Sequence, residues 1–273
     1  MINLLESIDF YLEKGYEDAY AMSKVAQDII LNKIATSKYK KNITIKGGVV
    51  MFNITNDRRR ATVDIDIDFI RYSLEDDNIF LLFNELNKLD DGIKIIVNKK
   101  IKLLKHQDYQ GKRVSIILKD LFGNQIETKI DIGVHKNLNI QQEEYIFDFE
   151  IFNNKMVLLV NTKEQIFVEK LSSLLKHGIR TTRYKDIYDF YYLITEGQMN
   201  KSLLIELINL YCIKQNQRFN EIIDIEKELN KIFNNDNFFQ HVKSSKYNWL
   251  EVDINIVLKE ILDYIKNLEK LFI

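Results

Sequence analysis

Three carboxylates occupy every second position in the segment DIDIDF, residues 64–69. Side chains two residues apart lie on the same face of a β-strand, so we expect Asp64, Asp66 and Asp68 to share a face. Like charges on one strand face repel each other, and a bound cation relieves that repulsion. Mg²⁺ commonly uses one or two carboxylates together with substrate phosphates. The alternative interpretation is an acidic strand face in contact with water.

A second acidic strand is expected downstream, in the segment ETKIDIGV. Asp131 lies there between Ile130 and Ile132, in the same alternation of apolar and acidic residues. If the two strands are neighbours in one sheet, Asp131 completes a three-carboxylate cluster with Asp64 and Asp66.

A pair of glycines precedes the first acidic strand. Lys46, Gly47 and Gly48 follow a short predicted strand and open a predicted helix with the sequence VVMFNI. Glycines let backbone N–H groups approach a phosphate, and a helix N-terminus favours negative charge. The alternative is an ordinary tight turn, but two acidic strands after the glycine pair favour a phosphate site.

Three segments in this order, KGGVVM, RATVDIDIDF and KIDI, resemble the nucleotidyltransferase superfamily related to DNA polymerase β. A later segment, FVEKLSSLLKHGIRTTRYKDIYDFYYL, is similar to the AbiEii/AbiGii abortive-infection toxin family of type IV toxin–antitoxin systems. Members of that family carry a lysine-bearing helix, an arginine-rich turn and an Asp-x-x-Asp helix. The resemblance covers roughly residues 40–195.

The resemblance implies transfer of a nucleotide from an NTP to an acceptor, with Mg²⁺, or alternatively Mn²⁺, as cofactor. It also implies a toxin or phage-defence role, a tRNA or other RNA acceptor and a cognate antitoxin protein. By position, the implied metal ligands are Asp64, Asp66 and Asp131, the other catalytic residues are Lys170 and Asp186, and the nucleotide-binding residues are Lys46, Gly47, Gly48, Arg60, Arg183 and Asp189. One position departs from the family pattern, because Val49 stands where Thr or Ser usually supplies a hydroxyl contact to phosphate.

The helical segment around Lys170 supports a special role for that lysine. Helical spacing places Lys170 within an apolar arc, and Asp186 lies beside apolar residues on the next predicted helix. A lysine on a buried face needs a partner. The functional interpretation is that Lys170 and Arg183 face the triphosphate, with Asp186 orienting them. The alternatives are a Lys170–Asp186 ion pair between helices, or an aspartate that only favours a helix N-terminus.

Basic residues on the predicted strands could bind an RNA backbone. The cluster lies beside Tyr109 and comprises Lys99, Lys100, Lys102, Lys105, Lys112 and Arg113. A solvated face in a lysine-rich chain is an equally good interpretation. Arg58, Arg59 and Arg60 either contact phosphates or occupy a polar turn.

Hydrophobic periodicity sets out the elements that must position these residues. It predicts two helices within residues 3–37, a strand at 42–46, a helix at 75–89 and a hairpin around the turn LFGN. Beyond residue 160 it predicts helices at 162–177, 183–195, 200–213, 220–232 and 253–271. We therefore expect an α+β fold with a mixed or antiparallel nucleotidyltransferase-like sheet and flanking helices in residues 1–160. A helical lobe, residues 161–273, is expected to complete a cleft.

Composition excludes several classes of protein. The chain has 273 residues, of which 46% are hydrophobic and 29% charged, so disordered, collagenous and disulfide-scaffold proteins are excluded. The net charge of -1 excludes a bulk polycationic coat for nucleic acid but allows a local basic groove. A single cysteine, the absence of a signal-peptide pattern and the lack of a long apolar run predict a cytoplasmic protein without a membrane span.

Two functions from other classes remain open. One is a catalytically silent nucleotidyltransferase fold that binds an NTP or a protein, which the valine at position 49 favours. The other is nucleotidyl transfer to a small molecule. The retained carboxylates favour an active enzyme, because a silent fold has no need of charges that repel each other.

Overall fold

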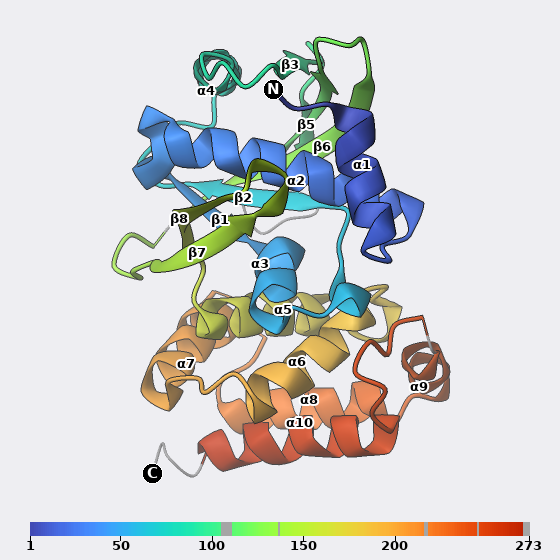
Figure 1. The fold of residues 1–273 in the computed structure, drawn as a ribbon. Coiled ribbons are helices and arrows are strands. Elements are labelled where there is room, and N and C mark those ends of the chain that lie inside the picture. Colours follow the sequence, from blue (N-terminus) through green and yellow to red (C-terminus); the bar gives the residue numbers. More distant parts are fainter. Residues whose placement is uncertain (105–110, 136, 216–217, 245, 270–273) are drawn as a thin grey trace. The chain divides into compact units, whose positions relative to one another are not determined.

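The structure of the protein is a computed structural model that describes residues 1–104, 111–135, 137–215, 218–244 and 246–269 (Figure 1). Residues within it form two compact units, Met1–Asn161 and Thr162–Ile273. The first unit is built around a β-sheet, and helices make up the second.

One mixed sheet forms the centre of the first unit. Its strands are β1 (Ile43–Lys46), β2 (Ile65–Phe69), β3 (Lys94–Val97), β4 (Lys102–Leu104), β5 (Gly111–Lys119), β6 (Gln125–Val134), β7 (Glu143–Phe149) and β8 (Asn154–Val160). They are ordered β3-β5-β6-β2-β1-β8-β7, and β4 also pairs with β5. β2 runs antiparallel to β1 and parallel to β6. The acidic strand therefore lies in the interior of the sheet, where both of its neighbours are fixed by backbone hydrogen bonds.

Four helices accompany this sheet: α1 (Leu4–Glu13), α2 (Asp18–Thr36), α3 (Gly47–Thr55) and α4 (Asp76–Leu86). Figure 1 shows α2 and α3 on opposite sides of β1 and β2. The apolar residues of β2, Ile65, Ile67 and Phe69, are all buried. The alternation of the segment thus directs its apolar side chains into the core and its carboxylates to the other face.

The expected α+β architecture is confirmed, and the turn LFGN does join the two strands of a hairpin, β5 and β6. The hairpin of β7 and β8 was not expected from the sequence. Ile146 of β7 is 63% exposed, so the alternation that marks a half-buried strand is broken there. β8 nevertheless pairs with β1 in parallel, and this is a second parallel pairing in the sheet besides that of β2 with β6.

The second unit consists of α5 (Lys163–His177), α6 (Lys185–Thr195), α7 (Lys201–Ile208), α8 (Ile222–Phe233), α9 (Asp236–Lys243) and α10 (Ile254–Glu269). The short helix α9 was not predicted. The helix expected over residues 200–213 is α-helical only to Ile208 and continues as a π-helical segment, Asn209–Lys214. No helix within the described residues is long and apolar enough to span a membrane.

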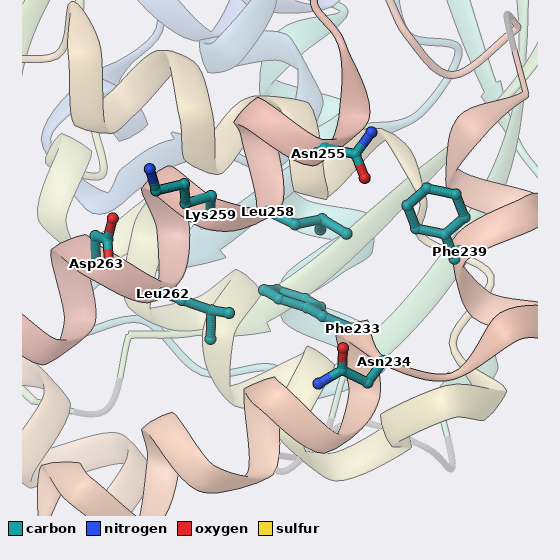
Figure 2. Close-up of a pocket in the computed structure, with 8 residues that line it drawn as sticks. All are labelled: Phe233, Asn234, Phe239, Asn255, Leu258, Lys259, Leu262 and Asp263. Carbon is teal, nitrogen blue, oxygen red and sulfur yellow. The ribbon is translucent and has the colours of Figure 1, made fainter.

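A cavity of about 290 Å³ lies within the second unit, between α8, α9 and α10. Figure 2 shows Phe233, Leu258 and Leu262 around it, with Phe239 of α9 on another side. None of the residues to which the sequence assigns chemistry lines this cavity.

A buried ion pair ties α2 to the loop that precedes β3. The side chain of Lys33 is fully buried, and its Nζ lies 2.7 Å from Asp91 Oδ1. The same ammonium group donates to the carbonyl oxygens of Leu86 and Leu89 at 3.4 and 3.5 Å. Several polar partners thus compensate a charge that would otherwise be costly to bury.

Replacing Asp91 with alanine should therefore lower the free energy of unfolding by about 3–5 kcal/mol, because it leaves the Lys33 ammonium without its counterion. Urea denaturation measures the change. The control is Asp148→Ala, which breaks an exposed pair with Lys155 and should cost less than about 1 kcal/mol. Equal effects of the two substitutions would contradict this assignment.

Candidate functional site

The two acidic segments lie side by side in the sheet. In the parallel pairing of β2 with β6, Asp66 is directly opposite Asp131. On the other side of β2, Asp66 is opposite Lys46 of β1. Residues directly opposite each other in a sheet project from the same face, so the two carboxylates share a face.

The three aspartates of the DIDIDF segment have different surroundings. Strand β2 begins at Ile65, so Asp64 immediately precedes it and is exposed. Asp66 is half-buried, whereas Asp68 is only 4% exposed. Lys46 Nζ lies 2.8 Å from Asp68 Oδ1. Lys46 was expected to bind nucleotide. In the structure this buried lysine compensates the charge of Asp68.

Both glycines of the pair lie so close to another side chain that a Cβ atom would not fit without a shift. Gly47 has φ +66°, and a Cβ atom added there would lie 2.5 Å from Asp66 Oδ2. A Cβ atom on Gly48 would lie 2.7 Å from Thr62 Oγ1. The start of α3 thus lies against Asp66 only because these positions carry no side chain. First-turn N–H groups of a helix have no partner within the helix and can bind a phosphate.

Val49, the residue that departs from the family pattern, is 1% exposed. Its side chain packs in the interior, so the missing hydroxyl affects a position that is not exposed to a ligand. The backbone N–H groups at the start of α3 do not depend on the side chain at this position.

Helix α2 supports the segment between the glycines and the aspartates. The buried Gln27 donates a hydrogen bond from Nε2 to the carbonyl oxygen of Thr62 at 2.8 Å. Thr62 is the residue that packs against Gly48. Neither Gln27 nor Thr62 was expected from the sequence to support the site, because a buried glutamine in a helix has no chemical signature of its own.

The role of Arg113 was also not expected from the sequence, which placed this residue in a basic cluster. Its Nε and Nη2 each lie 2.7 Å from one oxygen of Asp131, which makes a two-pronged ion pair. Hydrogen bonding to Asp131 raises the pKa of Arg113, and the negative charges of Asp64 and Asp66 act in the same direction. The hairpin register pairs Arg113 with Asp131, so counting outward from the turn LFGN could have revealed this contact.

The carboxylates fit a divalent cation in part. Carboxylate oxygens are suitable ligands for Mg²⁺, which often binds through two of them and substrate phosphates. Asp64 and Asp66 supply two carboxylates at the start of β2, whereas both oxygens of Asp131 accept hydrogen bonds from Arg113. Among the described residues, no group of three or more His, Cys, Asp or Glu side chains is arranged to hold a metal ion.

The second unit brings its predicted residues together as well. Lys170 contacts Asp186, and its Nζ lies 2.9 Å from Asp189 Oδ2. Asp189 is fully buried, and Lys170 is 9% exposed. This is the ion pair between helices that the sequence left open, with a second aspartate added. Arg183 is exposed, and it lines a recess beside Lys170 and Asp186 that is too narrow for a water molecule.

The remaining predicted residues are more scattered. Arg60 is 3% exposed, so it does not project freely into water. In the basic cluster, Lys99, Lys100 and Lys102 are exposed, whereas Lys112 contacts Asp76. Two other members of the predicted cluster, Lys105 and Tyr109, lie outside the described residues.

Comparison with known proteins supplies the family. A search of curated proteins finds no significant match to this chain. The family model described as nucleotidyl transferase AbiEii toxin, type IV TA system, matches residues 29–248, which is most of the chain. That range includes the glycine pair, all the aspartates named above, Arg113 and Lys170. The match confirms the resemblance seen in the motifs, and the chain belongs to the AbiEii family of nucleotidyl transferase toxins of type IV toxin–antitoxin systems.

Proposed function

We propose that this protein transfers a nucleoside monophosphate from an NTP to an RNA acceptor such as tRNA, with Mg²⁺ or Mn²⁺ held by Asp64 and Asp66. The observation that carries the proposal is the position of Asp66, which lies against Gly47 and opposite Asp131. A carboxylate next to a helix N-terminus provides cation-binding oxygens and phosphate-binding N–H groups at one place. As a member of a toxin–antitoxin family, the protein would be neutralised by an antitoxin encoded with it.

In this mechanism each group of the first unit has a separate task. The backbone N–H groups of Gly47 and Gly48 bind phosphate oxygens of the NTP, while Asp64 and Asp66 hold the cation. When bound, the cation neutralises charge on the triphosphate and activates the attacking hydroxyl. Lys46 compensates the charge of Asp68, and in this proposal Asp64 and Asp66 are the carboxylates that face the substrate. Positioning and charge compensation provide most of the catalysis in reactions of this type.

Replacing Asp66 with asparagine should reduce transfer of radiolabelled NMP to total RNA by about a hundredfold or more, because a catalytic cation is worth several kcal/mol. The matched control is Asp148→Asn, which removes an exposed carboxylate from β7 and should leave labelling unchanged. Equal labelling by wild type and Asp66→Asn would contradict the proposal.

The same assay separates the alternative functions. Transfer that continues when RNA is omitted and a small-molecule acceptor is supplied would indicate small-molecule modification. Calorimetric binding of an NTP without product from any acceptor would indicate a silent binding module. Labelled RNA that depends on Asp66 supports the proposed function over both.

A second prediction concerns Gly47. Alanine at this position would meet Asp66 Oδ2 and would have to adopt the positive φ of 66°. We expect the Asp66 carboxylate to be displaced and transfer to fall by about tenfold or more, which corresponds to at least 1.4 kcal/mol. Gly123→Ala is the control, because Gly123 has φ +92° but no atom of another residue near its Cβ position. It should show a similar backbone cost, about 1–2 kcal/mol, without loss of transfer.

Lys170 gives a third prediction. Lys170→Met should lower the free energy of unfolding by about 3–5 kcal/mol, because it leaves the carboxylates of Asp186 and Asp189 without this cation. Chemical denaturation measures this, with Lys231→Met on the exposed side of α8 as the control. Transfer measured at a temperature where the variant is folded then tests the catalytic role that the family resemblance implies. Unchanged stability would contradict the role of Lys170 as the counterion of the two aspartates.

A further inference from the structure

The contact between Arg113 and Asp131 occupies the carboxylate that the superfamily pattern assigns to metal binding. Nε and Nη2 of Arg113 each reach a different oxygen of Asp131, at 2.7 Å. A two-pronged pair between guanidinium and carboxylate is among the strongest hydrogen-bonded arrangements in proteins. The Asp131 side chain is 14% exposed, so water competes only weakly with this contact.

This arrangement has an electrostatic consequence for any cation at the site. A metal ion bound by Asp131 would share that carboxylate with Arg113 and would have to approach the fixed positive charge of the guanidinium. At Asp66, on the neighbouring strand, the adjacent groups are the start of α3 and Lys46 of β1. The charge of Asp131 is thus compensated by the guanidinium of Arg113, which lies on the strand next to β6.

We propose that Arg113 takes the place of a second cation at Asp131, so that the protein binds one divalent ion, at Asp64 and Asp66, and presents the guanidinium of Arg113 to a phosphate of the substrate. A guanidinium has five N–H donors, and the contact with Asp131 uses two of its nitrogen atoms. The Arg113 side chain is 40% exposed, so the remaining donors can be reached by a ligand. This inference rests on the proposed function, since it assigns a role within the same site.

If Arg113 has this role, its loss should change metal affinity and transfer rate in opposite directions, which loss of a purely structural ion pair would not do. Without Arg113, Asp131 becomes a third available carboxylate and a neighbouring positive charge is lost, so metal binding should tighten. The phosphate contact is lost at the same time, so transfer should slow. Tighter metal binding together with slower transfer is the expected signature of Arg113→Gln.

The experiment measures Mn²⁺ binding to the full chain by electron paramagnetic resonance and calorimetry, without nucleotide. Wild type should bind one Mn²⁺, and Asp66→Asn should abolish that binding. Asp131→Asn should weaken the affinity far less than Asp66→Asn does, because it leaves the charge of Arg113 uncompensated without removing a metal ligand, whereas Arg113→Gln should tighten it by about tenfold or add a second ion. The double variant, Arg113→Gln with Asp131→Asn, should return the affinity towards the wild-type value.

Two further variants control for charge and fold. Lys119→Gln removes a positive charge from the same face of β5, six residues from Arg113, and should leave Mn²⁺ binding unchanged. Arg113→Lys keeps the charge but loses the two-pronged geometry. Its metal affinity should therefore equal that of wild type, while its transfer rate should lie between those of wild type and Arg113→Gln. Circular dichroism and thermal unfolding establish that each variant is folded.

The outcomes distinguish this inference from the proposed function. The inference alone is overturned if Asp131→Asn weakens Mn²⁺ binding as much as Asp66→Asn does, or if Arg113→Gln leaves the affinity unchanged. Both proposals fail if wild type and Asp66→Asn bind Mn²⁺ identically. A wild-type protein that binds two Mn²⁺ ions without nucleotide also overturns the role of Arg113 while leaving the proposed function intact.

Discussion

The closeness of the Asp66 carboxylate to the backbone of Gly47 is the constraint on which the rest of the site depends. A Cβ atom at Gly47 would lie 2.5 Å from the carboxylate oxygen, so the contact exists only because the residue is glycine. It brings the start of α3 to the acidic strand, and so places next to each other the groups that we propose to bind phosphate and a cation. Gly48, the next residue, makes a similar close contact, because Thr62 packs against it. Gln27 of α2 donates a hydrogen bond to the carbonyl oxygen of Thr62. The interior strand β2 and the buried helix α2 therefore both support the site.

Charge balance then decides what the acidic residues can do. The acidic residues are Asp64 just before β2, Asp66 and Asp68 of β2, and Asp131 of β6. Lys46 compensates the charge of Asp68, and Arg113 compensates that of Asp131. Asp64 and Asp66 are the pair that we propose to hold the cation. Pairing of the other two carboxylates with cationic side chains stabilises an acidic face in the folded chain. It also explains how a nucleotidyl transferase of the AbiEii family can lack a compact three-carboxylate cluster among its described residues.

The helical unit carries its own polar network in an apolar interior. Lys170 of α5 pairs with Asp186 and Asp189 of α6. Between the same helices the rings of Phe167 and Phe190 pack edge to face, with their centroids 4.9 Å apart. A lysine with two aspartates in such surroundings fixes how α5 and α6 pack, because a shift of either helix would leave a buried charge unpaired. The residues that resemble the family motif therefore have a structural task in this unit, whatever they contribute to catalysis.

The sequence by itself determined the acidic alternation around Asp66, the glycine pair before α3, the hairpin of β5 and β6 and most of the helices, because each depends on local periodicity and turn chemistry. It did not reveal the β7–β8 hairpin, where the exposed Ile146 breaks the alternation, or the helix α9, which has only eight residues. The partners of the charged residues were likewise beyond it: Lys46 was expected at the nucleotide and Arg113 in a basic cluster, yet each pairs with an aspartate. Only the tertiary structure decided these pairings, since strand order and register choose which distant side chains meet. Periodicity shows which face a residue occupies, but not what lies opposite.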